Sequence, residues 1–142
     1  MSDNSAGMKF NWSIRVYYED TDAAGVVYHA SYLKFMERAR TEWLRSLGYS
    51  QESLKKEEQI VFAVANINIR FVKPALLDQE LNVITTVTNV GGASIRFEQS
   101  IIDNESTQTI CQADVDVVCI DSDALKPKRI PETVKAKFYH GE

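Results

Sequence analysis

Three carboxylates stand close together where an alternating, strand-like pattern ends and a helical pattern begins. Glu19, Asp20 and Asp22 precede a small-residue turn around Gly25, and a long amphipathic segment starts near Tyr28. The first N–H groups of a helix lack acceptors within the helix, so with the helix dipole they can bind a carbonyl oxygen that becomes an oxyanion. A carboxylate beside them could attack an activated acyl carbon, or deprotonate a water that attacks it. A thioester suits such a site because its thiolate is a good leaving group.

The same residues also have an ordinary structural interpretation. Asp and Thr before a helix commonly cap it or form turns, so residue types alone leave both capping and catalysis open. The sequence contains no G-x-S-x-G elbow, no G-x-G-x-x-G and no P-loop. Its two histidines, His29 and His140, lie far apart and do not have the spacing of metal ligands. We therefore expect no metal and no flavin, nicotinamide or pyridoxal cofactor.

Length and composition favour one ordinary globular domain. The chain has 142 residues, of which 44% are hydrophobic and 25% charged, and its net charge of −4 gives no global basic field for nucleic acid. No segment approaches the roughly 18 consecutive apolar residues of a membrane span, and the N-terminus does not resemble a signal peptide. We expect a cytoplasmic protein with a flexible tail over residues 1–9 and a single domain over 10–142.

Hydrophobic periodicity predicts the elements that position the carboxylates. Residues 10–18 alternate as a half-buried strand does. From about Tyr28 the period becomes that of a helix, for which Gly48 supplies the end. A short polar helix over 50–58 and a final helix over 131–139 are also expected, and four strands in a meander should cover 60–72, 81–88, 95–101 and 107–120. This order predicts an α+β fold in which one curved antiparallel sheet of about five strands wraps one long central helix.

Apolar positions define the expected core. The helix carries a stripe that should face the sheet, formed by Tyr32, Phe35, Met36, Ala39, Trp43 and Leu47. Cys111 and Cys119 share the apolar face of the last strand, roughly 26 Å apart when extended, so we expect two buried thiols and no disulfide. The outer face of the sheet is expected to be apolar enough to pack on a partner subunit.

The string YEDTDAAGVVYHASYL, residues 18–33, closely resembles the active-site motif of the 4-hydroxybenzoyl-CoA thioesterase family of hotdog-fold proteins. Residues 35–44 (FMERARTEWL), 73–78 and 127–131 look like the bacterial acyl-CoA thioesterase branch that is associated with the Tol-Pal envelope system. The resemblance covers about residues 11–131, nearly the whole chain. It implies a hotdog fold, hydrolysis of acyl-CoA without a cofactor, and a homodimer or dimer of dimers with active sites at the subunit interface.

The resemblance also implies roles for particular residues. The catalytic carboxylate falls on Asp22, the backbone amide that polarises the thioester carbonyl falls on His29, and Gly25 lets the loop pass close to the substrate. Asp20 is expected to shape the turn, and Arg40, at the edge of the apolar stripe, is a candidate partner for a motif carboxylate. Tyr28 and Tyr32 are expected either in the core or in the pocket wall. CoA phosphates need basic residues at the rim; the candidates are Lys73, Arg96, Lys126, Lys128 and Arg129, and the cluster from Lys126 to Arg129 is favoured.

Other functions remain open on the sequence alone. The same chemistry could act on a thioester of acyl carrier protein instead of CoA. The chain could also be a binding or scaffold module for lipid-synthesis or envelope partners, with weak residual hydrolysis. A hotdog dehydratase is less expected, because those enzymes usually place a catalytic His on a different motif. The sequence gives neither the acyl-chain preference nor the choice between nucleophile and general base.

Overall fold

The computed structural model describes residues 8–140, apart from the side chain of His140. The predicted tail over 1–9 lies almost wholly outside these residues, and Lys9 already belongs to the first strand. The helical elements are a 3-10 turn η1 and three α-helices: η1 Tyr18–Asp20, α1 His29–Ser46, α2 Gln51–Glu58 and α3 Glu132–His140. The strands are β1 Lys9–Arg15, β2 Ile60–Phe71, β3 Glu80–Val90, β4 Ser94–Asp103 and β5 Thr109–Asp121.

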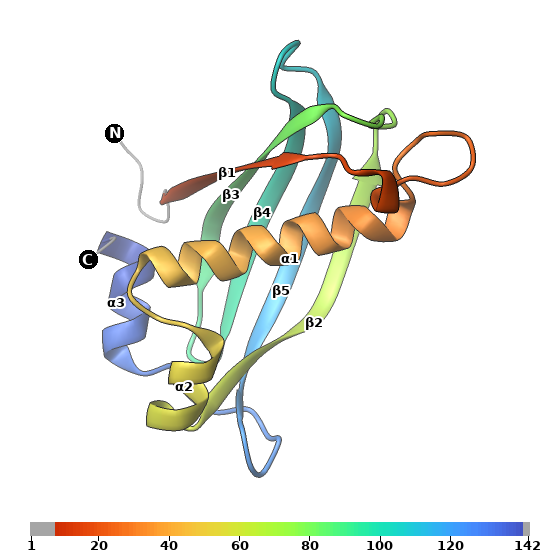
Figure 1. Ribbon diagram of the computed structural model, residues 1–142. Coiled ribbons are helices and arrows are strands. Elements are labelled where there is room, and N and C mark those ends of the chain that lie inside the picture. The colour runs from red at the N-terminus through yellow and green to blue at the C-terminus, as the bar shows by residue number, and fades with distance from the viewer. Residues whose placement is uncertain (1–7, 141–142) are drawn as a thin grey trace.

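One antiparallel sheet curves around α1, as Figure 1 shows. Its strand order is β1-β3-β4-β5-β2, and every neighbouring pair runs antiparallel. The predicted α+β hotdog fold is therefore confirmed. The predicted meander is wrong for β2, which pairs with β5 at the far edge instead of with β3. A hairpin between β2 and β3 would need a short turn, whereas residues 72–79 are long enough to cross the end of the sheet.

The apolar stripe of α1 forms the centre of the core, as predicted, and all six of its side chains are at most 8% exposed. Trp43 contacts three rings from different elements, with centroid distances of 6.0 Å to Phe10, 6.0 Å to Phe97 and 5.8 Å to Phe138. These contacts join β1, β4 and α3 to one residue of α1. The helix is thus fixed over the sheet along most of its length, and the position of its first turn is fixed with it.

Both ends of α1 match their predictions. The helix begins at His29, and the preceding residue, Tyr28, is extended and gives it no side-chain cap. It ends before Gly48, whose φ of +97° lies in the left-handed region that favours glycine. Ser50 caps α2 as expected, because its side chain accepts a hydrogen bond from the Ser53 N–H at 3.0 Å.

Strand β1 is shorter than predicted. It ends at Arg15, and Tyr18, which was expected within the half-buried strand, is 82% exposed. The reason is η1, which is closed by Asp20: its Oδ2 accepts a hydrogen bond from the Tyr17 N–H at 2.9 Å. This side-chain bond replaces a strand ladder with a turn.

The outer face of the sheet is mainly polar but also carries Ile84, Ile102, Val118 and Ile120, so it is less apolar than expected, and its packing on a partner subunit stays a prediction. Strand alternation turns these side chains outward: Asn82, Thr86, Thr88, Arg96, Glu98, Ser100, Gln112, Asp114 and Asp116. Cys111 and Cys119 are free and buried on the inner face, as expected. Among residues 8–140, no helix is both long and apolar enough to cross a membrane.

Candidate active site

The loop between η1 and α1 holds Asp22 at the surface. Its backbone N–H donates to Val26 O at 2.9 Å, and its O accepts from the Gly25 N–H at 3.0 Å. Oδ1 accepts the Ala24 N–H at 2.8 Å, which leaves Oδ2 without a partner among the described residues. Gly25 has a φ of +81°, a conformation that L side chains adopt at a cost, so the turn needs a glycine there. One oxygen therefore orients the exposed carboxylate while the other stays available.

Asp20 has the turn-shaping position that was expected for it. It is only 6% exposed, and besides the side-chain bond to Tyr17 its O accepts the Tyr28 N–H at 2.9 Å. Both ends of the loop are thus fastened to one residue. Because its side chain is already used and buried, Asp20 is poorly placed to react with a substrate.

The start of α1 presents a backbone donor. No residue that the structure describes accepts a hydrogen bond from the His29 N–H. Tyr28 is 51% exposed, and its ring lies 4.5 Å from the imidazole of His29, centroid to centroid. The N-terminus of this 18-residue helix is therefore open to an electron-rich oxygen.

Residues 72–79 form the second wall of the site. Ala75 O accepts the Val27 N–H at 2.9 Å, and the Ala75 N–H donates to Tyr32 Oη at 3.0 Å. Tyr32 is 3% exposed and packs its ring against Phe71 at a centroid distance of 5.6 Å. Burial raises the pKa of its hydroxyl. Of its two expected places, core or pocket wall, Tyr32 takes the core.

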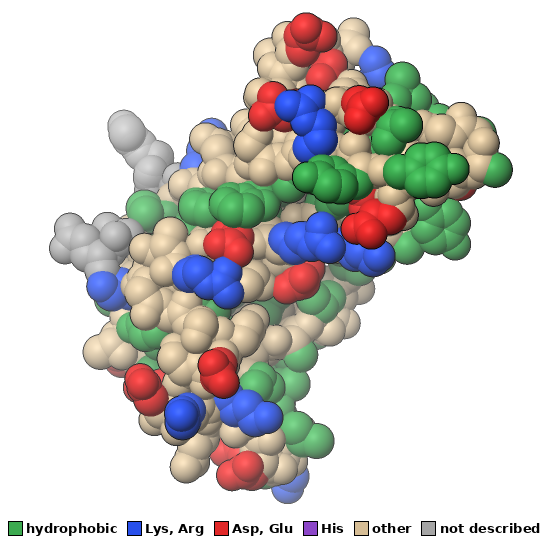
Figure 2. Space-filling view, in the orientation of Figure 1, with side chains coloured by type: hydrophobic (Ala, Val, Ile, Leu, Met, Phe, Trp, Pro, Cys, Tyr) green, Lys and Arg blue, Asp and Glu red, His purple; other side chains and the backbone are tan. Residues whose placement is uncertain are grey.

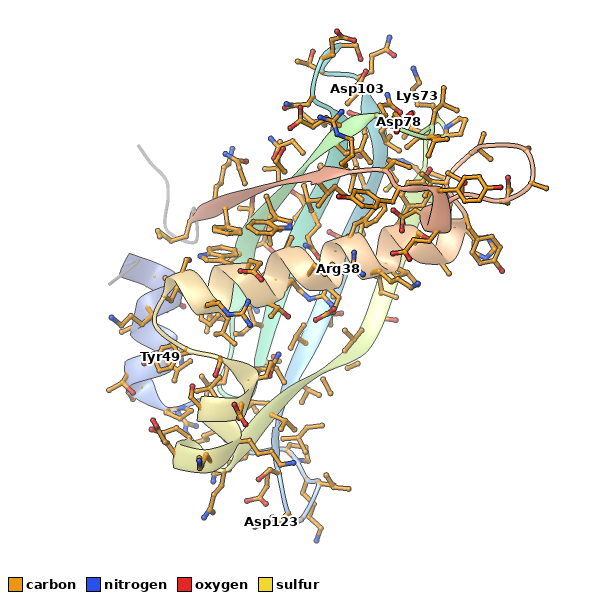
Figure 3. All side chains as sticks on the ribbon, viewed as in Figure 1. Arg38, Tyr49, Lys73, Asp78, Asp103 and Asp123 are labelled. Carbon is orange, nitrogen blue, oxygen red and sulfur yellow. The ribbon has the colours of Figure 1, made fainter. Side chains whose placement is uncertain are left out.

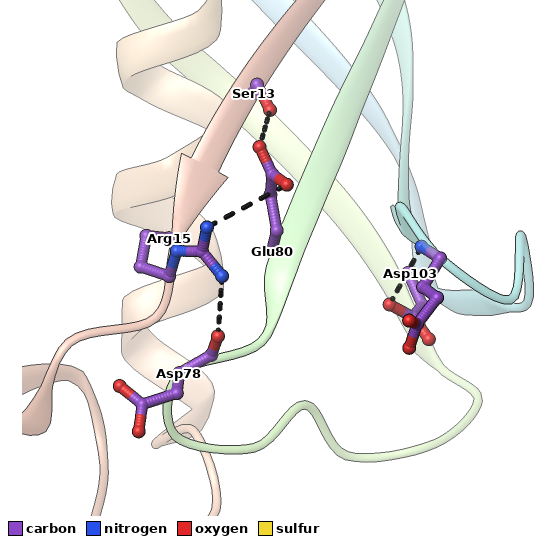
Figure 4. Close-up of polar contacts among 6 residues, drawn as sticks. Ser13, Arg15, Asp78, Glu80 and Asp103 are labelled. Atoms are coloured by element: carbon purple, nitrogen blue, oxygen red, sulfur yellow. Dashed lines mark hydrogen bonds and ion pairs between the residues drawn. The ribbon is translucent and has the colours of Figure 1, made fainter.

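The far end of this segment is tied to β1, as Figure 4 shows. Arg15 Nη1 donates to Asp78 O at 2.8 Å, and Arg15 Nη2 lies 3.9 Å from Glu80 Oε1. Ser13 Oγ donates to Glu80 Oε2 at 3.0 Å. These contacts are exposed, so each adds little stability, but together they set where residues 72–79 enter β3.

Exposed apolar side chains gather around the loop, at the end of the molecule where α1 begins (Figure 2). They come from η1, the loop, the end of β2 and the segment after it: Tyr17, Tyr18, Tyr28, Phe71, Val72, Leu76 and Leu77. An apolar patch of this kind, beside an exposed carboxylate, indicates a binding or subunit surface.

The basic residues expected to contact CoA phosphates do not lie together in the fold. Lys73 lies at the Asp22 end of the sheet, where Figure 3 shows it near Asp78 and Asp103, and its Nζ donates to Gln108 Oε1. Arg96 lies on the outer face and is engaged by Asp116, through bonds of 2.7 and 2.9 Å.

The cluster from Lys126 to Arg129 lies at the other end of the sheet, beyond the last residue of β5. Lys128 Nζ lies 3.7 Å from Asp121 Oδ2 and donates to Glu58 O at 3.2 Å. The length of β5, roughly 40 Å for 13 residues, separates this cluster from the Asp22 loop of the same chain.

Arg40 does not pair with a motif carboxylate, and that expectation is wrong. Its Nη1 donates to Gln99 Oε1 at 2.8 Å underneath α1. Gln99 is fully buried on β4 and was missed by the sequence reasoning, although the signal was present: it is the polar residue in the inward alternation of Ile95, Phe97 and Ile101.

Comparisons with known proteins identify the family of the chain. Residues 16–138 match the model of the thioesterase-like superfamily. The acyl-CoA thioesterase YbgC of Haemophilus influenzae is 49% identical over 131 residues, covering 92% of this chain and 95% of that protein. A probable thioesterase from Bartonella henselae is 36% identical with a TM-score of 0.81, over 87% of this chain and 100% of that one. The 1,4-dihydroxy-2-naphthoyl-CoA thioesterase of Synechocystis is 26% identical with a TM-score of 0.85, over 93% and 96% of the two chains. The chain belongs to the thioesterase-like superfamily of hotdog-fold proteins.

Proposed function

We propose that this protein hydrolyses acyl-CoA thioesters, with Asp22 as the nucleophile or general base and the His29 amide as the oxyanion donor. The observation that carries the proposal is a single short loop with two complementary groups. It begins with an exposed carboxylate that has one available oxygen, and it ends at the open N-terminus of an 18-residue helix. The similar protein from Haemophilus influenzae is itself named an acyl-CoA thioesterase.

The chemistry follows from these two groups. The thioester carbonyl oxygen accepts the His29 N–H, and the carbon then reacts with the Asp22 carboxylate or with a water that Asp22 deprotonates. Negative charge develops on the oxygen, where the amide and the helix dipole stabilise it. The C–S bond then breaks and the CoA thiolate leaves. If Asp22 is the nucleophile, a water hydrolyses the resulting anhydride; in both routes the products are the free acid and CoA.

We further propose that two copies pair through β2. This strand lies at the edge of the sheet, so one row of its backbone N–H and C=O groups is available to another strand. Two-fold pairing would be antiparallel and isologous. The Phe71 end of β2, beside the Asp22 loop, would then face the Ile60 end of the second copy.

This pairing gives the distant basic cluster a role. The Ile60 end of β2 pairs with Asp121, the residue from which the chain continues to Lys126, Lys128 and Arg129. Those side chains of one copy would therefore approach the Asp22 loop of the other, where CoA phosphates need cations. Sedimentation equilibrium tests the pairing; a fully active monomer would contradict a shared site. Whether two dimers associate further is a question for the same measurement.

The substrate carrier and the cellular location are parts of the same proposal. We favour CoA over acyl carrier protein, and turnover on the two thioesters at equal acyl length decides between them. We place the enzyme in the cytoplasm, where CoA thioesters are formed; cell fractionation followed by a hydrolysis assay tests this.

The decisive experiment compares Asp22→Asn with wild type on a panel of CoA thioesters, from short aliphatic to long-chain and aromatic. An Asn Oδ1 can still accept the Ala24 N–H, so fold and oligomeric state should not change. Turnover should fall by about 10²–10⁴-fold, the typical contribution of a positioned base. Glu19→Gln is the control, because it removes one exposed negative charge three residues away. Near wild-type turnover by Asp22→Asn would refute the mechanism.

A further inference from the structure

A buried chain of hydrogen bonds fixes the position of one guanidinium. Gln99 is 0% exposed, and its Nε2 donates to Met36 O at 3.0 Å and to Thr85 Oγ1 at 2.9 Å. Because the amide nitrogen must face these two groups, its Oε1 faces the other way, where Arg40 Nη1 donates to it at 2.8 Å. Arg40 is therefore held from β4, across the interface between helix and sheet.

The guanidinium lies on the wall of a cavity of about 140 Å³ between α1, β2 and α3. An apolar cavity of about 150 Å³ accepts a molecule the size of benzene. The apolar part of the wall comes from α1, β2, β4, β5 and α3 and includes Leu44, Phe62, Val64, Phe97 and Phe138. The cavity thus has the size and the lining for a short acyl group.

Arg40 is a partly buried cation whose charge interacts with that of Glu37 but is not paired with it in a salt bridge. Burial lowers the pKa of its guanidinium, and no carboxylate within residues 8–140 forms a salt bridge with it. Glu37, one turn away on α1, lines the same cavity, but it is exposed and accepts a hydrogen bond from Thr41 Oγ1 at 2.7 Å. Gln99 is its sole side-chain acceptor among the described residues, so most of its N–H donors are unused. A partly desolvated guanidinium of this kind favours a carboxylate ligand.

The cavity lies too far along α1 to receive a short acyl group from the Asp22 loop of its own chain. Eleven helical residues separate His29 from Arg40, which is roughly 16 Å at 1.5 Å per residue. The cavity instead lies at Phe62 and Val64, in the half of β2 that the proposed two-fold pairing turns toward the catalytic loop of the other copy. Val64 is 47% exposed at this edge.

We infer that this cavity receives the acyl group of a thioester bound at Asp22 and His29 of a second copy, and that Arg40 selects acyl groups that end in a carboxylate. The substrate class is then CoA thioesters of short dicarboxylic acids, with about four to six carbons by comparison with the benzene-sized cavity. This inference rests on the proposed hydrolysis and on pairing through β2.

The test compares kcat/KM for succinyl-CoA and butyryl-CoA, whose acyl groups have equal carbon counts. Wild type should prefer succinyl-CoA. Arg40→Met should lower kcat/KM for succinyl-CoA by about 10–100-fold, as expected for the loss of a charge-assisted pair, and change that for butyryl-CoA by less than about threefold. Arg40→Lys keeps the positive charge, so its kcat/KM for succinyl-CoA should lie between those of wild type and Arg40→Met. Arg45→Met is the matched control, because Arg45 is an exposed guanidinium of the same helix, paired with Glu42.

Two results would overturn the inference. The first is a wild type with no preference for succinyl-CoA. The second is an equal fall in kcat/KM for both substrates in Arg40→Met, which would make the role of Arg40 purely structural. Calorimetric binding of both thioesters to Asp22→Asn, with and without Arg40→Met, separates this inference from the proposed function. If wild type hydrolyses neither thioester, tighter binding of succinyl-CoA that depends on Arg40 would keep the inference and reject the catalytic assignment. Equal binding of the two would reject the inference.

Discussion

Replacing Tyr32 by Phe removes the oxygen atom through which α1 binds residues 72–79, the segment beside the Asp22 loop. Tyr32 Oη accepts the N–H of Ala75, a residue with 0% exposure, so the change leaves a buried amide without an acceptor. The ring contacts with Phe35 and Phe71, at 6.2 and 5.6 Å, are kept by Phe. The expected cost is therefore that of an unsatisfied buried donor, about 1–3 kcal/mol of the free energy of unfolding.

This cost converts into a measurable change in Tm. An unfolding entropy of about 2.1 cal/mol/K per residue gives about 0.3 kcal/mol/K for this chain, so Tm should fall by roughly 3–10 °C. Scanning calorimetry at one fixed protein concentration measures it, because a dimer makes Tm depend on concentration. Turnover should fall as well, since Ala75 also binds the loop through Val27.

Tyr28→Phe is the control for this experiment. It removes the same group from a tyrosine four residues earlier that is 51% exposed and whose hydroxyl forms no hydrogen bond with the described residues. Its Tm should stay within about 1 °C of wild type, since exposed substitutions are usually worth less than about 0.5 kcal/mol. If Tyr32→Phe also melted within 1 °C of wild type, the reasoning about the Ala75 amide would be refuted.

Two further predictions concern titratable groups. The Ser106 hydroxyl, with help from the Glu105 amide, holds the pKa of Asp103 below its usual range. The ionised Asp103 carboxylate therefore stabilises the folded protein above about pH 4, and this stabilisation is lost as the pH falls through the lowered pKa. Asp103→Asn should thus be less stable than wild type at pH 7, and urea titrations should show this difference shrinking below pH 4; a constant difference would contradict it. Burial raises the pKa of Cys111 to about 12 and also raises that of Cys119, so neither thiol should react with Ellman's reagent at pH 8 until denaturant exposes both. Rapid labelling of the native protein would count against this.

The sequence predicted what depends on local periodicity. The helix from His29 to Ser46, its glycine stop and the buried cysteines all follow from patterns within a few turns or strand residues. The family was recognised from the string around Asp22, and the comparisons confirm it. The catalytic roles of Asp22 and His29 stay predictions, because a carboxylate and a helix start have the same geometry whether or not they react.

What the sequence could not give are relations between distant segments. The pairing of β2 with β5 depends on how residues 72–79 cross the sheet, which no local pattern encodes. The basic candidates looked equivalent as a set, yet Arg96 is engaged by Asp116 and the cluster after β5 lies at the opposite end from Asp22. Gln99 shows the same limit: its polar character was visible, but its link to Arg40 exists only once β4 lies under α1.

The edge position of β2 has a consequence during synthesis. This strand leaves the ribosome long before β5, since its Ile60 end pairs with Asp121 and its Phe71 end with Cys111. At about 5–20 residues per second, translation of the intervening 50 or so residues takes roughly 2–10 s. For that time the nascent chain carries Phe62, Val64 and Phe71 on an unpaired strand, so chaperone contacts with the nascent chain should concentrate there.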